Sequence, residues 1–136
     1  MRPGEEVLSL HVGFDIDGCL DEDPAFFASL MSALKAAGHR ITVMTGASTK
    51  HPTQDDLDEK AQYLNALGMG KLYDDLVVFA DPPHKAKAKF CKKQKVDALF
   101  DNDVQNLNRA SKYCTAIGVW NSLIPPEDKS STKVGL

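Results

Sequence analysis

The chain has 136 residues, with 16 Lys and Arg against 19 Asp and Glu, and a formal net charge of −3 at pH 7. This length predicts one domain that buries its own core, and the acidic balance argues against nucleic acid as the main partner. Three cysteines without a Cys-x-x-Cys pair indicate neither a disulfide framework nor a zinc site. No signal peptide and no membrane-spanning run is recognisable. We therefore expect a cytoplasmic protein with reduced thiols that does not enter a membrane.

Apolar residues alternate between short runs, typical of strands, and helical spacing. The first predicted strand covers Val7 to Phe14 and is followed by strands at 41–45, 76–80, 96–100 and 115–120. Helices are predicted at 24–37, 55–67, 85–95 and 105–113. This alternation predicts a doubly wound, Rossmann-like α/β fold of three layers, with a five-stranded parallel sheet whose first strand is central. We expect a single domain over 1–124 and a polar tail over 125–136.

Polar residues follow several of these strands. They are Asp15, Asp17, Thr45 and Asp101. The carboxyl ends of parallel strands lie along one edge of the sheet, where open α/β sheets bind their ligands. Neighbouring carboxylates repel each other unless a cation neutralises them, and Mg²⁺ is held by one or two carboxylates together with phosphate oxygens. The strand ends therefore predict a magnesium and phosphate site.

A lysine at the start of the predicted helix 85–95 reaches over the same edge. Lys85 is the first choice, and Lys87 and Lys89 are its rivals. The remaining lysines of this helix predict a solvated face, with a nucleic-acid patch as the alternative.

The pattern resembles the haloacid dehalogenase (HAD) superfamily, whose four motifs occur here in order. They are matched by Phe14-Asp15-Ile16-Asp17-Gly18-Cys19-Leu20, by Thr42-Val43-Met44-Thr45-Gly46, by Lys85, and by Leu99-Phe100-Asp101-Asn102 with Asn106. The resemblance covers roughly residues 7 to 120 and implies a Mg²⁺-dependent phosphomonoester hydrolase, a phosphatase that acts through an aspartyl-phosphate.

The resemblance also implies a role for each motif residue. Asp15 would be the nucleophile and Asp17 the general acid and base. Mg²⁺ would be held by Asp15, Asp101 and the backbone carbonyl of Asp17. Thr45 would donate to a phosphoryl oxygen, and Lys85 would orient Asp15.

Four further positions are secondary candidates, namely Gly46, Asn102, Asp103 and Asn106. Asn102 departs from the Asp-Asp pair that is frequent in the fourth motif. It would hold a metal-bound water, or Asp103 would take the acidic role instead.

The segments after the first and second motifs are too short for a cap domain, so the resemblance is to a small capless (C0-type) member. An open site suits a large phosphorylated substrate, or a homo-oligomer in which a neighbour covers the mouth. The alternatives are a non-catalytic binding or assembly protein with the HAD fold, and a polynucleotide-end or phosphoprotein phosphatase. A dehalogenase is disfavoured by Asp17, and a receiver domain by the position of Thr45 before the third strand.

Overall fold

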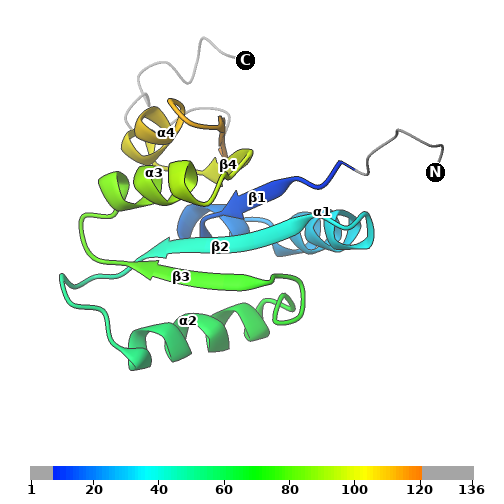
Figure 1. Cartoon of the computed structure of the whole chain (residues 1–136). Coiled ribbons are helices and arrows are strands. Elements are labelled where there is room, and N and C mark those ends of the chain that lie inside the picture. The colour runs from blue at the N-terminus through cyan, green and yellow to red at the C-terminus, as the bar shows by residue number, and fades with distance from the viewer. Residues whose placement is uncertain (1–7, 121–136) are drawn as a thin grey trace, which may run out of the picture.

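A computed structural model describes residues 8–120, so Val7 and the predicted polar tail at 125–136 lie outside the described residues. The sheet has five parallel strands in the order β3-β2-β1-β4-β5, which places β1 at the centre as predicted. The strands are β1 (His11–Phe14), β2 (Arg40–Gly46), β3 (Asp75–Phe79), β4 (Ala98–Asp101) and β5 (Thr115–Gly118). The predicted doubly wound α/β fold is confirmed, and the labelled strands point the same way in Figure 1.

The connecting helices are α1 (Pro24–Ala36), α2 (Gln54–Ala66), α3 (His84–Lys93) and α4 (Val104–Ala110). The start of α1 follows from local chemistry, because Pro24 suits the first turn and Oδ1 of Asp23 accepts from the Phe26 amide at 3.2 Å. A short, wide helical turn, η1 (Ile16–Leu20), follows β1 and was not predicted. No helix within residues 8–120 is long and apolar enough to cross a membrane.

The core lies on both faces of the sheet. Alternate residues of a strand point to opposite faces, so Phe14 of β1 packs with Phe27 of α1, whereas Met44 of β2 packs with Cys91 of α3. One cluster joins the sheet to α1 and α2, and the other joins it to α3 and α4. These two clusters make the three layers, with helices on either side of the strands (Figure 1).

Strand β3 differs from its prediction. Its apolar run was expected to be buried on both faces, but the residues from Asp75 to Val78 are only half-buried, and Phe79 alone is buried. The reason is its place at the edge of the sheet, where it pairs with β2. Asp75 forms an exposed ion pair with Arg40 there, at 2.8 Å.

The strand order places the carboxyl ends of β1 and β4 side by side. Phe14 pairs with Phe100, and the backbone amide of Asp15 donates to the Phe100 carbonyl at 2.9 Å. Successive strands run from β1 outward to β2 and β3 on one side, and β4 and β5 lie on the other. The direction in which successive strands are added to the sheet therefore reverses between β1 and β4. The crevice at the carboxyl ends of two such strands is where doubly wound sheets bind ligands.

Candidate functional site

The centre of the site is a lysine between two carboxylates. The Nζ of Lys87 donates to Oδ1 of Asp15 at 3.0 Å and to Oδ2 of Asp101 at 2.9 Å. The Lys87 side chain is only 1% exposed, and Asp101 is fully buried. Charges are buried in proteins only when they are paired, so these three side chains form one electrostatic unit, which we call the Asp-Lys-Asp cluster.

The lysine of this cluster is not the first choice from the sequence. Lys85 is exposed on the outer side of α3, whereas Lys87 lies on the helix face that packs against the sheet, together with Ala88 and Cys91. The prediction that Lys85 orients Asp15 is therefore wrong, and its rival Lys87 makes that contact.

The electrostatics of the cluster leave one negative charge in excess. The pKa of the Asp15 carboxyl is raised to about 7; burial is the largest cause, the Lys87 ammonium lowers the pKa and the Asp101 carboxylate raises it. Burial lowers the pKa of the Lys87 ammonium, but Asp15 and Asp101 outweigh burial and raise it above its ordinary value. Lys87 therefore stays charged, and the raised pKa of Asp15 means that it gains a proton more readily than an ordinary aspartate.

Two of the secondary candidates hold Asp101 in place. The Asn106 side chain donates to Oδ2 of Asp101 at 3.1 Å, and the backbone amide of Asp103 donates to Oδ1 at 2.9 Å. The Asp103 carboxylate itself caps α4 by accepting from the backbone amide of Asn106 at 3.0 Å. Asp103 is thus a helix cap and does not supply a further carboxylate to the cluster.

Asp17 does not join the other carboxylates. Its side chain is 68% exposed and pairs with Lys60 of α2 at 3.5 Å. The expected convergence of the Asp15 and Asp17 carboxylates fails because the chain leaves β1 into η1, where Gly18 has a φ of +74°. Residues i and i+2 share a side only while the strand continues.

The amide group of Asn102 closes this end of the site. With the amide oriented so that its nitrogen faces these acceptors, the nitrogen lies 2.9 Å from the Asp17 carbonyl oxygen and 3.2 Å from Oδ2 of Asp15, and donates to both. Asn102 therefore links the η1 turn to the Asp-Lys-Asp cluster through the backbone of Asp17. The sequence indicated Asn102 as a secondary candidate but did not predict this contact.

Thr45 and Gly46 end β2 at the same edge of the sheet. Thr45 is fully buried, and within the described residues its hydroxyl is the one buried side-chain polar atom without a hydrogen-bond partner. An unpaired buried hydroxyl costs free energy, so this position favours a ligand or water oxygen nearby. A Cβ at Gly46 would lie 2.9 Å from the Pro83 ring, which explains a glycine there.

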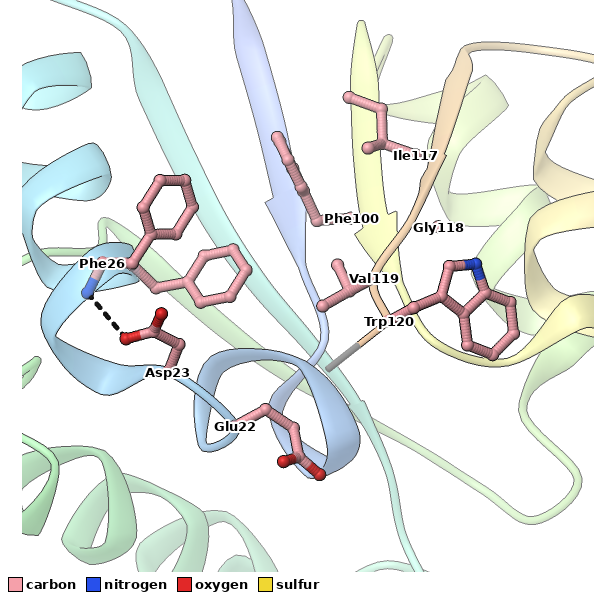
Figure 2. A pocket seen from close by; sticks show the side chains of 9 residues that line it. Glu22, Asp23, Phe26, Phe100, Ile117, Gly118, Val119 and Trp120 are labelled. Carbon is pink, nitrogen blue, oxygen red and sulfur yellow. Dashed lines mark hydrogen bonds between the residues drawn. The ribbon is translucent and has the colours of Figure 1, made fainter. Parts of the chain in front are cut away.

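A second feature of this edge is an aromatic pocket, which the sequence did not indicate. Its volume is about 280 Å³, and Figure 2 shows it between the start of α1 and the end of β5. The lining residues are Glu22, Asp23, Phe26, Phe27, Phe100, Ile117, Gly118, Val119 and Trp120. Phe26 and Trp120 are 55% and 54% exposed, which is high for rings of this size.

The pocket and the cluster share neighbouring backbone. Phe100 lines the pocket and directly precedes Asp101, and the Val119 amide donates to the Asp101 carbonyl at 3.0 Å. Glu22 and Asp23 stand at the opposite rim, just after the η1 turn that begins beside Asp15 (Figure 2). A ligand anchored at the cluster therefore has an apolar pocket on the same edge of the sheet.

Comparisons with known proteins give a fold and no family. No family model matches the chain, and no curated protein sequence matches it. Among solved structures, it is similar to one described as "Crystal structure of universal stress protein in complex with cAMP", with 15% sequence identity and a TM-score of 0.54. The alignment covers 84% of this chain and 98% of that one. At this identity, the likeness shows the shared α/β/α fold with its parallel sheet.

The resemblance to the HAD superfamily is contradicted, because the named neighbour is a universal stress protein and no family model matches. The interpretation as a magnesium-dependent phosphatase with an aspartyl-phosphate falls with it, as do the alternatives drawn from the same superfamily. In residues 8–120, no group of three or more His, Cys, Asp or Glu side chains is placed to hold a metal ion. Polar residues at strand ends are common to many families that share this architecture, and a shared fold does not fix a function.

The η1 turn allows a direct stability test. We expect Gly18→Ala to destabilise the fold more than Gly38→Ala, although both glycines have a positive φ, of +74° and +88°. The left-handed backbone costs an alanine roughly 1–2 kcal/mol at either position. A Cβ at Gly18 would also clash with the Asn102 side chain, whereas nothing lies within 4 Å of a Cβ at Gly38. Urea unfolding measures both losses, and equal values would contradict the contact between η1 and Asn102.

Proposed function

We propose that the chain binds a nucleotide at the carboxyl edge of its sheet. The phosphate would lie beside the Asp-Lys-Asp cluster, and the base would enter the aromatic pocket. The observation that carries this proposal is the lysine buried between two carboxylates where the strand order reverses. Such an arrangement is costly to fold, and it lies where doubly wound sheets bind their ligands.

The phosphate end needs a cation in addition to Lys87. Two carboxylates and one ammonium leave a net charge of −1, which repels a phosphate. Mg²⁺ stays our prediction for the compensating ion, since it prefers oxygen ligands and is often bound together with substrate phosphates. Oδ2 of Asp15, the Asp17 carbonyl and the side chain of Asn102 lie together, and turning the Asn102 amide would offer a third oxygen. The donor chemistry fits such an ion, and the phosphate would complete its coordination.

The aromatic pocket fits the planar base of a nucleotide. Ligand sites are mostly apolar with a few polar groups that set orientation, and aromatic side chains stack with planar rings. Phe26 and Trp120 both line this pocket and are more than half exposed, and the Asp23 carboxylate lies at the rim, where an amino group of a base would donate. The solved neighbour is described as a complex with cAMP, which supports a nucleotide over other phosphorylated molecules.

Tryptophan fluorescence tests this proposal, because Trp120 is the single tryptophan of the chain and lines the pocket. Titration with adenosine monophosphate in Mg²⁺ should quench the emission and saturate. Ribose 5-phosphate, which has no base, should bind in calorimetry without the same quench. An emission that AMP does not quench, or a quench that grows with AMP concentration without saturating, would contradict the proposed function.

Two variants and the removal of Mg²⁺ serve as controls. Phe26→Ala should weaken AMP more than ribose 5-phosphate, because it removes a ring from the base pocket alone. Asp15→Asn should weaken both ligands in Mg²⁺, because it removes the carboxylate oxygen that would hold the ion. Chelation of Mg²⁺ should also weaken both, and undiminished binding in excess chelator would remove Mg²⁺ from the proposal.

An enzymatic role stays a prediction. It is measured in the same samples by chromatography of the ligand after long incubation, and a ligand recovered unchanged would contradict catalysis. A homo-oligomer also stays a prediction, for which light scattering is the measurement. We further infer a cytoplasmic location, because Cys19, Cys91 and Cys114 are all unpaired thiols.

A further inference from the structure

A basic groove runs between α3 and α4, away from the residues assigned so far. Its volume is about 230 Å³. The lining residues are Lys85, Ala88, Lys89, Lys92, Arg109, Lys112 and Tyr113. Five of these seven side chains are cations and none is a carboxylate, although the chain as a whole has a net charge of −3.

Helix geometry arranges these cations in two lines. Lys85, Lys89 and Lys92 are spaced i, i+4 and i+7, so they form a row about 10 Å long on one side of α3. Arg109 and Lys112, from the end of α4 and the turn after it, provide the opposite wall. The groove is therefore flanked by positive charge on both sides.

Within residues 8–120, the cations of this groove have no carboxylate partner. Lys92 instead lies 5.5 Å from the centre of the Tyr113 ring. Like charges held close together repel each other, and a site of one sign attracts the opposite one even when the net charge of the protein is unfavourable.

We propose that this groove binds the backbone of single-stranded nucleic acid. Paired rows of cations follow a linear chain of phosphates, and Tyr113, which is 44% exposed, offers a ring for stacking at one end. A protein partner would need apolar or aromatic anchors, and this groove offers only Ala88 and Tyr113. A membrane surface is disfavoured for the same reason, and the groove is too small for a duplex.

Net charge alone argued against nucleic acid. It averages over the whole molecule, however, whereas binding depends on the local field. The helix spacing that buries Lys87 on the inner face of α3 also gathers Lys85, Lys89 and Lys92 on the outer one.

Fluorescence anisotropy with a labelled oligothymidylate of about 12 nucleotides, within the site size of single-strand binders, tests the proposal. Lys89→Glu with Lys112→Glu should weaken binding at least tenfold. The matched control is Lys93→Glu with Lys71→Glu, which makes the same change of net charge at exposed positions outside the groove. This control should change the affinity less than threefold.

The salt dependence gives a second measurement. Every phosphate that the protein no longer neutralises should reduce the slope of log K against log salt by about 0.7, so the groove variant should show a slope shallower by about 1.4. Equal weakening by both double variants would overturn the proposal, as would an equally tight complex with a duplex or with poly-glutamate of the same charge. Circular dichroism melting of each variant confirms that it is folded. AMP should quench Trp120 equally in the groove variant and in the wild type. Failure of the groove proposal would therefore leave the proposed nucleotide site unaffected.

Discussion

Replacing Lys87 with methionine should cost about 3–5 kcal/mol of unfolding free energy at pH 8, the range for removing one partner from a buried ion pair. Methionine fills a similar volume, so packing changes little and the loss is electrostatic. Asp15 and Asp101 would then face each other without the ammonium that now lies 3.0 and 2.9 Å from them. The loss should shrink as the pH falls toward 5, because a protonated carboxyl no longer needs a partner.

Lys85→Met is the matched control for this experiment. Lys85 lies on the same helix, two residues earlier, but its side chain is exposed. We expect this change to stay within about 0.5 kcal/mol, as for most surface substitutions. Urea unfolding followed by circular dichroism measures both. If the two variants lose the same stability, Lys87 is not the residue that neutralises the cluster.

The fold was predictable because its signals are local and repeated. Strand and helix patterns alternate along the chain, and alternation with short connections leaves few topologies. The same patterns brought Asp15, Asp101 and Asn106 to one edge of the sheet, where the structure places them. The edge position of β3 was not predictable from its apolar run, because that run does not say how many neighbours the strand has.

Lys87 was only a rival to the first choice, Lys85, although the sequence held a signal that favours it. Lys87 and Cys91 are four residues apart, and Ala88 lies between them, so the three share a face of the helix. Lys85 was preferred for its place at the start of the helix, but its spacing puts it on the opposite side, with Lys89 and Lys92. Helical periodicity was therefore the better guide than position along the helix.

The aromatic pocket needed information that the sequence did not carry. Phe26 followed the helical spacing of a core residue, and Trp120 stood at the end of a predicted strand, so neither suggested an exposed ring. Their place along one pocket depends on how α1 and β5 are arranged in the fold, which no local pattern fixes. The motif resemblance failed for a related reason, since polar residues at strand ends belong to the architecture as much as to any one family.

In metal-free solution with chelator, the stability of the protein should fall as the pH rises from about 4 to about 7, and Asp15→Asn should abolish much of this fall. The carboxyl of Asp15 has a pKa of about 7 when folded and 3.8 in its ordinary state, chiefly because of burial. Between these values the folded protein holds a proton that the unfolded chain has released. Stability therefore declines with pH across this window, by up to about 1.4 kcal/mol per unit for one group.

The variant should thus be more stable than the wild type at pH 8 and similar to it near pH 4, where the wild-type carboxyl is also neutral. Asp74→Asn is the control, because the hydrogen bond from Lys35 lowers the pKa of Asp74. The stability that Asp74 contributes is present above its ordinary pKa and is lost only at lower pH, so its removal should not change the slope between pH 5 and 8. Urea midpoints at each pH are the measurement. The contrary result is a wild-type protein that becomes more stable from pH 5 to 8 in chelator, with Asp15→Asn following the same curve. It would mean that Lys87 fully neutralises the Asp15 carboxylate. The cluster would then carry no excess negative charge for a cation to balance.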